Sequence, residues 1–395
     1  MIPRGIFASL ACLSFLLLLW QWLAARRFPL HRRVADKSFA PAVTLLKPLK
    51  GCDATTADSL RSWLTQDFAG EVQILFGVTS AADPACAVVR NLLAAFPQRD
   101  AQLVVCPERL GANSKVSKLA QLEPLAKHDI VIVTDADVRA PADLLTNVVA
   151  LLRKPEVGLV NCLYQLANPT TPAMRWEAVA VNADFWSQVL QSRSLRPLDF
   201  ALGAVMAVKR EALQNIGGFA ALTDYLADDY ELGNRVARAG WRIELCPVVV
   251  ECWSAPMRRR EVWRHQLRWA RTIRACQPVA YFFSILSNAT LWPLLWLLAA
   301  SPAIQVATGP GDLVLSLALP KAVLLGGLCL IVRMLVALDL QHRLTRSYAH
   351  LRDWWLVPAK DVLQAALWLL AFTGRRIDWR GERFRLMGDG RLVKD

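Results

Sequence analysis

The sequence predicts an α/β domain with a mostly parallel sheet, set between an N-terminal membrane anchor and C-terminal membrane helices. From about residue 40 to residue 250, short runs rich in Val, Ile and Leu alternate with helical stretches. This alternation is typical of a parallel sheet covered by helices on both faces. Apolar residues make up 54% of the 395 residues, and the mean hydropathy of +0.29 is high for a soluble protein, which predicts membrane segments.

The first apolar run, Ile6–Ala25, carries no charge and has about the length of a bilayer-spanning helix. It is followed at once by basic side chains, which are expected to stay in the cytoplasm: Arg26, Arg27, His31, Arg32 and Arg33. A cleaved signal peptide is the alternative, but the basic residues follow the apolar run and no small-residue cleavage site separates the two. Residues 1–34 are therefore predicted to be an anchor with its basic flank.

Residues 35–257 are predicted to form the catalytic domain, on the cytoplasmic side. Its expected strands lie in the runs AVTLLKPLKG, VQILFGVTS, AQLVVCPER, DIVIVTDADV, VGLVNCLY, GAVMAVKREAL and IELCPVVVE. The nine cysteines include no C-x-x-C pair and no histidine spacing typical of zinc, so they are interpreted as reduced thiols of a cytoplasmic domain.

The net charge of +13 raises the question of a polyanionic partner. Nucleic acid is not expected, because the basic residues cluster beside apolar segments and do not alternate with aromatic residues on a soluble module. An anionic lipid bilayer is the expected partner.

Two runs after Pro278, Val279–Val306 and Leu317–Leu338, are each long enough to cross a bilayer. Pro293 in the first and Arg333 in the second are unusual inside such spans. Because the anchor is expected to run from outside to inside, two further crossings would return the chain to the cytoplasm.

A third apolar stretch, Trp354–Phe372, contains Pro358, Lys360 and Asp361, and its uncharged part is short for a span. A full crossing would also expel the basic tail GRRIDWRGERFR from the cytoplasm, against the positive-inside rule. We therefore expect an interfacial or re-entrant segment within the C-terminal region 278–395.

Residues 258–277 are predicted to form an amphipathic helix that lies in the membrane interface. At 3.6 residues per turn its apolar arc comprises Val262, Trp263, Leu267, Trp269, Ala270 and Ile273. The opposite arc comprises Arg260, Arg264, His265, Arg268 and Arg271.

Acidic residues stand at several places where strands are expected to end. Asp135 and Asp137 directly follow the apolar run VIVT, and Asp83 follows the second expected strand. Asp228 and Asp229 open an amphipathic helix. Asp is a common turn residue, so punctuation is one interpretation. The other is a divalent cation, because hard cations take oxygen ligands and strand ends of open α/β sheets bind ligands.

The order of these motifs resembles the membrane-bound inverting glycosyltransferases of the GT-A type, and more narrowly the ceramide glucosyltransferase family. The resemblance is carried by LLKPLKGCD, DPA, DADVR, GGF, ADDYELG, AGWRI and DWRGERFRL, and it spans nearly the whole chain. Within the family, ADDYELG and WRHQLRWARTIR are most similar to the bacterial hopanoid-biosynthesis branch.

The resemblance implies a role for each matching residue. Asp83 would contact the uracil of a UDP-sugar, and Asp135 and Asp137 would hold Mg²⁺ or Mn²⁺ on its diphosphate. Asp229 would be the general base. The other donor contacts would be Lys47, Pro48, Lys115, His265, Arg268 and Trp269.

Two residues depart from the family pattern. His265 stands where the family has Gln or Arg in Q/R-x-x-R-W, so an imidazole would have to make that contact. The family often has a small residue where Asp137 stands, so Asp137 either binds metal through water or orients Asp135.

The predicted function is an inverting, metal-dependent transfer of one sugar from UDP-N-acetylglucosamine or UDP-glucose to a hydroxyl group of a membrane lipid. The resemblance favours a hopanoid polyol as acceptor, and hence a multi-pass protein of the bacterial inner membrane. Ceramide is the alternative acceptor. A haloacid-dehalogenase-like phosphatase, in which Asp135 is phosphorylated, is the alternative of another class. A processive polysaccharide synthase would need more membrane helices than the sequence predicts.

Overall fold

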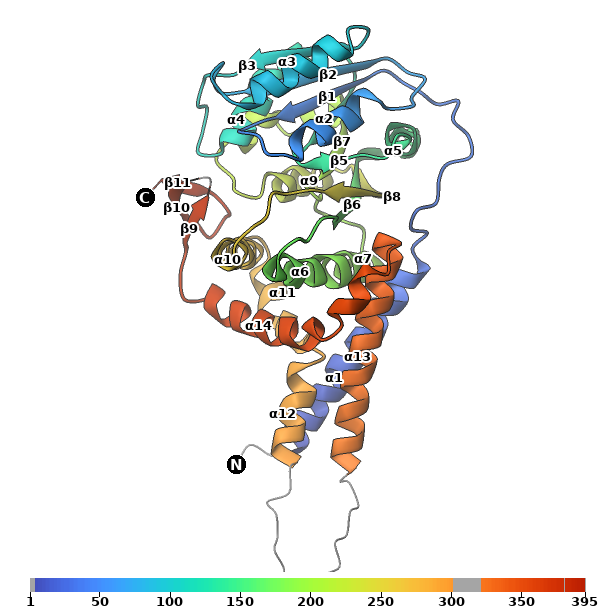
Figure 1. Cartoon of the computed structure of the whole chain (residues 1–395), viewed down its shortest axis with the longest axis vertical. Coiled ribbons are helices and arrows are strands. Elements are labelled where there is room, and N and C mark those ends of the chain that lie inside the picture. The colour runs from blue at the N-terminus through green and yellow to red at the C-terminus, as the bar shows by residue number, and fades with distance from the viewer. Residues whose placement is uncertain (1–3, 301–320, 380, 395) are drawn as a thin grey trace, which may run out of the picture.

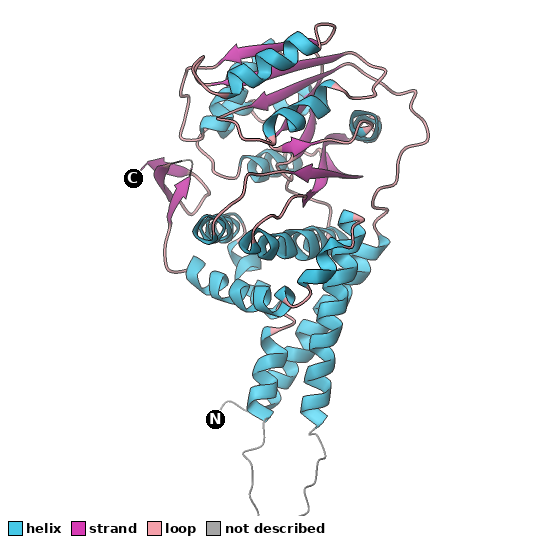
Figure 2. Ribbon diagram, in the orientation of Figure 1, coloured by secondary structure: helices cyan, strands magenta, loops and turns pink. Residues whose placement is uncertain are grey.

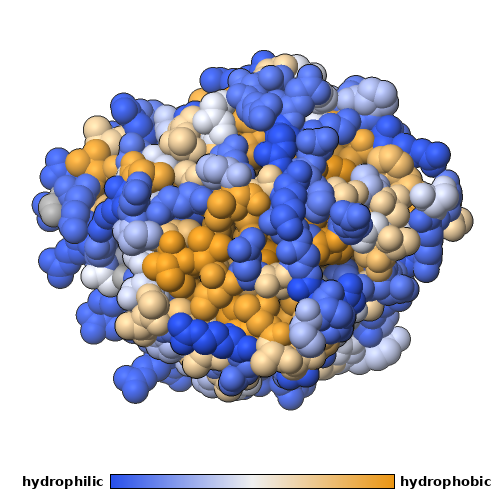
Figure 3. All heavy atoms as spheres, turned by 90° about the horizontal axis from the view of Figure 1, so that it is seen from above, coloured by the Kyte–Doolittle hydropathy of each residue, from blue (hydrophilic) through white to orange (hydrophobic). Residues whose placement is uncertain are grey.

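The computed structural model describes residues 4–300, 321–379 and 381–394. All labelled strands lie in the upper part of the molecule, and the lower part consists of helices (Figures 1 and 2). Seen from above, hydrophilic residues dominate the outline of the strand-bearing end and surround an apolar area (Figure 3).

Eight strands form the main sheet, in the order β3 (Asp100–Val105), β2 (Val72–Val78), β1 (Val43–Pro48), β4 (Ile130–Thr134), β7 (Val205–Lys209), β6 (Val157–Leu166), β8 (Arg242–Cys252) and β5 (Val138–Arg139). The first four are parallel, and so are β6 and β8, but β7 runs antiparallel to both neighbours and β5 antiparallel to β8. The predicted α/β class is confirmed, and each of the seven predicted runs contains a strand. The expected mostly parallel sheet is also confirmed, since six of the eight strands run in one direction, although the reversed strands β7 and β5 make the sheet mixed.

The side chains of the central strands point alternately to the two faces of the sheet, so the core has two layers. Val131 and Val133 of β4 pack into one buried cluster, and Ile130 and Ile132 pack into another. Successive side chains of a strand point to opposite faces, so an almost wholly apolar strand must be covered on both faces. The covering helices include α2 (Thr56–Leu64), α3 (Ala85–Ala95), α4 (Ser114–Leu122), α5 (Leu144–Leu152), α7 (Trp186–Leu195), α8 (Arg210–Gln214) and α9 (Asp228–Arg238).

Helices α1 (Arg4–Arg27), α12 (Leu291–Ala300) and α13 (Lys321–Thr345) extend together away from the sheet (Figure 1). Within the described residues, α1 and α13 are the two helices long and apolar enough to cross a membrane, and α13 includes Arg333. The predicted span Leu317–Leu338 lies in α13 except for residues 317–320, which are outside the described residues.

The predicted span Val279–Val306 is not one straight helix. The segment containing α11 (Pro278–Phe283) meets α12 at a bend of 48°, so the pair forms at most a broken span or a re-entrant loop. The break has a cause in Asn288, whose side-chain oxygen accepts hydrogen bonds from the amides of Thr290 and Leu291 at 3.2 and 2.9 Å. Pro293 then falls in the first turn of α12, where a missing N–H breaks no helical bond. Residues 301–306 of this predicted span are outside the described residues.

Arg333 is accounted for by a buried ion cluster. Its guanidinium donates two hydrogen bonds to Asp361 of α14 (Leu356–Ala371), at 2.8 and 2.9 Å, and one to Asp184 at 2.9 Å. Lys360 contacts the same two carboxylates. Asp184 belongs to η2 (Ala180–Phe185), a π-helical turn before α7. The cluster therefore joins the apolar helix α13 to α14 and to η2.

Helix α10 (Arg259–Cys276) is covered by protein along one side. Val262, Gln266 and Ala270 are buried, and α10 packs against α6 (Pro172–Val179) and α14. Much of the apolar arc that the sequence assigns to the membrane interface is therefore occupied by protein contacts. Helix α14 itself crosses the direction of α1 and α13 (Figure 1).

The basic tail forms a second sheet that the sequence does not predict. Strand β10 (Glu382–Leu386) pairs antiparallel with β9 (Arg376–Trp379) and β11 (Leu392–Lys394). Its buried residues pack on Leu226, which precedes α9. The tail thus reaches the main domain beside the acidic pair that opens α9.

We predict that Arg333→Met destabilises the protein by about 3 kcal/mol, because removing one partner leaves buried carboxylates undercompensated. Thermal unfolding of the full chain in detergent measures the change. Arg26→Gln is the matched control, since Arg26 pairs with Asp339 at 3.7 Å on the surface of the same helices. Equal melting temperatures for the two variants would contradict the prediction.

Candidate active site at the strand ends

One lysine joins two of the acidic motifs. The Nζ atom of Lys115 lies 2.8 Å from Asp135 Oδ1 and 2.9 Å from Asp228 Oδ2, and the Lys115 side chain is only 8% exposed. Burial alone would lower the pKa of Lys115, but the two carboxylates raise it above its ordinary value. Asn113 fixes the lysine locally, because its side chain caps α4 by accepting from the amides of Lys115 and Val116.

A second lysine lies beneath the aspartate pair. Lys47, near the end of β1, is fully buried, and its Nζ donates to the backbone oxygen of Asp135 at 3.0 Å and lies 4.7 Å from the ring centroid of Trp63. Burial lowers the pKa of Lys47 to about 7, although Asp135 and Asp137 oppose this. Burial, together with the charge of Asp135, raises the pKa of Asp137 to about 6.

Asp229 is placed by the start of α9. Its Oδ1 accepts from the amide of Tyr230 at 2.8 Å, and a Cβ on Gly203 would stand 2.9 Å from its Oδ2, so a larger residue at 203 would displace this carboxylate. A Cβ on Gly233 would likewise clash with the backbone of Phe200 and Ala201, so this glycine lets α9 approach the loop before β7. Burial and then the charge of Asp228 raise the pKa of Asp229 to about 6.

Asp83 lies in the loop between β2 and α3. Its Oδ1 accepts from the amides of Gly51 and Ala85, each at 2.9 Å. Gly51 has φ of 68°, which favours glycine. Asp83 therefore connects the loop after β1 to the loop after β2. Pro48 is the last residue of β1.

The H-x-x-R-W residues lie on α10, at the end of a series of ring contacts. His265 Nδ1 lies 2.6 Å from Glu177 Oε1, and the His265 ring lies 4.8 Å from that of Trp269. Trp269 lies 6.1 Å from Phe185, which lies 5.6 Å from Tyr164 at the end of β6, all measured between ring centroids. Arg268 precedes Trp269 on the same helix.

Two of these residues carry no signal in the sequence. Glu177 is buried and is contacted by both His265 and the side-chain amide of Gln266, at 2.6 and 2.8 Å, yet it stands in an ordinary helical stretch. Tyr164 ends an apolar strand; its pKa is well above the ordinary value, through burial and then the charges of Cys252, Asp229, Asp135 and Glu177. A chain pattern shows neither, because both depend on contacts between distant segments.

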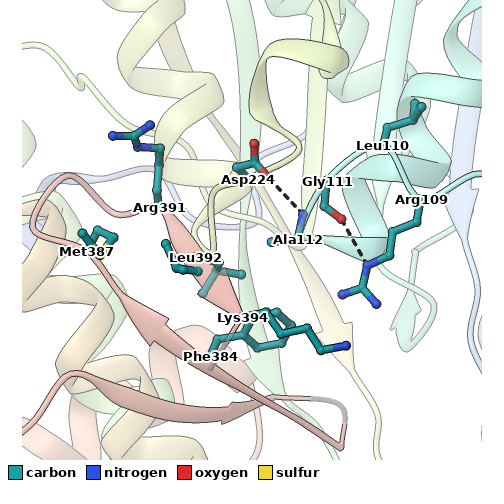
Figure 4. A pocket seen from close by; sticks show the side chains of 11 residues that line it. Arg109, Leu110, Gly111, Ala112, Asp224, Phe384, Met387, Arg391, Leu392 and Lys394 are labelled. Carbon is teal, nitrogen blue, oxygen red and sulfur yellow. Dashed lines mark hydrogen bonds between the residues drawn. The ribbon is translucent and has the colours of Figure 1, made fainter.

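The tail sheet borders an open surface hollow of about 730 Å³ next to the loop that leads into α4. Figure 4 shows Arg109, Gly111 and Ala112 facing Phe384 and Lys394 across it. Backbone hydrogen bonds close its edge, from Leu392 to Asp224 O at 2.7 Å and from Leu226 to Gly390 O at 3.3 Å. The tail therefore contacts the segments that precede Lys115 and Asp228.

Asp135 and Asp137 suit a divalent cation that is coordinated partly by the protein and partly by a bound ligand. Among the residues that the structure describes, no group of three His, Cys, Asp or Glu side chains could hold a metal alone. Mg²⁺ sites that use substrate phosphates need only one or two protein carboxylates, which Asp135 and Asp137 could provide. Desolvation and the charge of Asp135 raise the pKa of Asp137, and a cation between the two carboxylates would relieve their repulsion.

Comparison with known families gives one match across nearly the whole chain. The sequence model of glycosyl transferase family 21 matches residues 6–392.

Several characterised proteins are similar over part of the chain. Ceramide glucosyltransferase 3 of Caenorhabditis elegans is 25% identical over 223 residues, which is 56% of this chain and 48% of that protein. The β-monoglucosyldiacylglycerol synthase of Trichormus variabilis is 25% identical over 246 residues, or 61% of this chain and 51% of that protein. The matched region thus spans about half the length of these relatives.

Among solved structures, a mannosyltransferase from Pyrobaculum calidifontis in complex with GDP-Man and Mn²⁺ is similar, with a TM-score of 0.57 and 23% identity. The similarity covers 93% of this chain and 98% of that chain. It confirms the predicted glycosyltransferase fold with its C-terminal helices.

We predict that Leu392→Ala loosens the tail sheet by about 2 kcal/mol or more, because Leu392 is 4% exposed in the cluster around Leu226. Faster hydrogen exchange at residues 224–226 would report the change. Val393→Ala is the matched control, since Val393 is next in β11 and 49% exposed. Unchanged exchange in Leu392→Ala would mean that the tail does not stabilise this loop.

Proposed function

Because the chain belongs to glycosyl transferase family 21, we propose that it transfers one sugar from a UDP-sugar to a hydroxyl group of a membrane lipid, with inversion at the sugar. The observation that carries the proposal is the gathering of Asp135, Asp229 and Lys115 at the strand ends of a domain fastened to apolar helices. The names of the relatives, a ceramide glucosyltransferase and a glucosyldiacylglycerol synthase, support a lipid acceptor.

In the proposed reaction Asp229 is the general base. Its carboxylate takes the proton from the acceptor hydroxyl while that oxygen forms a bond to the anomeric carbon of the donor sugar. The bond from that carbon to the diphosphate breaks, and UDP leaves with the bonding electron pair. A base with a pKa of about 6 is ionised at neutral pH and still able to accept a proton, which suits this role.

The leaving diphosphate needs positive charge nearby. Lys115 has three N–H donors and places two of them on Asp135 and Asp228, so one can reach a phosphate oxygen. Arg268 can offer a second cation from α10. Mg²⁺ or Mn²⁺ held by Asp135, with Asp137 as ligand or as its support, would supply Lewis-acid stabilisation of the same diphosphate.

The rest of the donor site follows from position. Asp83, held by the loop after Pro48, is proposed to contact the uracil, and Lys47 supports Asp135 from below. Trp269 and His265 are proposed to complete the pocket. Glu177 orients the His265 ring, which explains how an imidazole can serve where relatives of the family have Gln or Arg.

We propose a hopanoid polyol as the acceptor and N-acetylglucosamine or glucose as the sugar, on the resemblance of ADDYELG and WRHQLRWARTIR to the hopanoid branch. Ceramide is the second candidate, supported by the relative from Caenorhabditis elegans. The corresponding location is the bacterial inner membrane, with the catalytic domain in the cytoplasm. Membership of a glycosyl transferase family argues against the phosphatase alternative.

The test uses membranes containing the full chain with Mg²⁺ or Mn²⁺. UDP-glucose or UDP-N-acetylglucosamine is crossed with ceramide or bacteriohopanetetrol, and lipid extracts are analysed by mass spectrometry. We expect a glycosylated hopanoid, reduced at least about 100-fold in Asp229→Asn because a general base is lost. Glu231→Gln, on the same helix but paired with Arg235, should stay close to wild type.

The outcomes separate donor from acceptor. Glucosylceramide alone would replace the hopanoid by ceramide. Release of free UDP without any glycolipid would support the proposed donor site and would contradict both proposed acceptors. No UDP and no glycolipid with any donor would contradict the transferase proposal.

The pH dependence follows from Asp229. Its pKa of about 6 means that the base is protonated and inactive at lower pH, so the transfer rate should fall about tenfold per unit below pH 6 and level off above it. Initial rates between pH 4.5 and 8 measure this. The acid limb should be absent from the residual activity of Asp229→Asn; if it persists there, another group controls it.

Metal binding gives a readout independent of turnover. With UDP present, Asp135→Asn should lower Mn²⁺ affinity at least about 100-fold, as expected for loss of a direct ligand, measured by electron paramagnetic resonance of free Mn²⁺. Asp143→Asn, which removes a surface carboxylate paired with Arg33, is the control. Unchanged affinity in Asp135→Asn would exclude Asp135 as a ligand.

A further inference from the structure

Helix α14 has two apolar faces, and only one is covered by protein. Val357, Leu367 and Ala371 are buried against the neighbouring helices. On the opposite side an apolar stripe is exposed, with 61% of Leu369 accessible, and it repeats with the helical period: Val362, Leu363, Ala366, Leu369 and Leu370. An isolated soluble surface rarely carries such a stripe.

The stripe continues into exposed aromatic rings. Phe282 of α11 is 53% exposed and lies 6.2 Å from Trp368 and 6.4 Å from Phe372, between ring centroids. Phe283 is also exposed. Aromatic side chains at the end of apolar helices are typical of the boundary between acyl chains and headgroups.

Directly beyond this apolar surface the chain forms a cationic hollow of about 550 Å³. It is lined by residues of α10, of the segment that follows α14, and of β10: Arg271, Thr373, Gly374, Arg375, Arg376 and Arg385. Four guanidinium groups from three segments therefore meet close to the point where α14 ends.

The hollow is framed by guanidinium contacts with the backbone. Arg271 donates to the carbonyl oxygen of Arg376, and a Cβ on Gly374 would lie 3.1 Å from the Arg271 guanidinium. Arg274 donates to the carbonyl oxygen of Gly374 at 3.3 Å and stacks 5.5 Å from the centroid of Phe372. In the described part of the chain, the Nε atoms of Arg271 and Arg274 are buried without a hydrogen-bond partner. Two N–H donors, the Nε groups of Arg271 and Arg274, are thus unpaired within the described residues, and the neighbouring positive charges repel one another.

We propose that this hollow binds the phosphate group of an anionic phospholipid whose acyl chains lie along the exposed stripe of α14. A phosphate satisfies clustered guanidinium groups by charge-assisted hydrogen bonds. The adjoining apolar stripe favours a lipid over a free anion, because only a lipid would cover both surfaces at once. The occupied hollow would also set the depth of α10, which carries Arg268 and Trp269, relative to the bilayer.

The test measures lipid binding and does not depend on the proposed reaction. The full chain in a mild detergent is mixed with equal amounts of phosphatidylglycerol and phosphatidylcholine of the same acyl length, and native mass spectrometry counts the retained lipid. We expect phosphatidylglycerol to be preferred. Arg375→Gln with Arg385→Gln should lower that affinity about 30-fold, given about a factor of five for each basic residue near an anionic surface.

The matched control is Arg61→Gln with Arg90→Gln, two exposed arginines on α2 and α3 that remove the same charge away from the hollow. It should retain phosphatidylglycerol like wild type. If the Arg375 and Arg385 double variant loses no more lipid than this control, the proposal is overturned.

A second variant covers the case in which the arginine variant unfolds. Leu369→Ser should weaken the binding of phosphatidylglycerol. It should have little effect on the binding of soluble glycerol phosphate, which has no acyl chains. Equal retention of phosphatidylglycerol by Leu369→Ser and wild type would overturn the lipid assignment. So would complete displacement of the lipid by millimolar glycerol phosphate, because the hollow would then be a site for free anions.

Discussion

The candidate site depends on the ion contacts of Lys115. One ammonium group lies between Asp135, at the end of β4, and Asp228, at the start of α9, and so fixes the distance between a strand end and a helix start that are far apart in the sequence. Its ion pairs are with those two carboxylates. Asp137 and Asp229 each have a pKa raised to about 6, and these are the groups for which a cation and a proton are the natural partners.

The membrane part and the site are joined through consecutive residues of one π-helical turn. Asp184 contacts Arg333 of the long apolar helix α13, while the next residue, Phe185, lies against both Trp269 and Tyr164. The apolar helix α13 and the aromatic contacts of Trp269 are therefore linked through two adjacent residues of η2.

The sequence predicts most of the fold, because long apolar strands and uncharged helices carry strong periodic signals. It does not predict the antiparallel insertion of β7, since strand direction leaves no mark on composition. The tail strands are also missed, because Arg376–Trp379 and its partners are short and mostly charged. In the site, the motif carboxylates could be named in advance, whereas Glu177 and Tyr164 could not, because their roles come from contacts across the fold.

The tail sheet also has a consequence for biosynthesis. Its strands follow every described membrane helix in chain order, so they leave the ribosome after those helices, yet they close the loops beside Lys115 and Asp228. The catalytic domain can form its main sheet early, but these loops gain their last hydrogen bonds only after the membrane helices have been synthesised. A nascent chain halted before Arg376 would thus be anchored but incompletely ordered, which delays full assembly of the site until the chain is in its membrane.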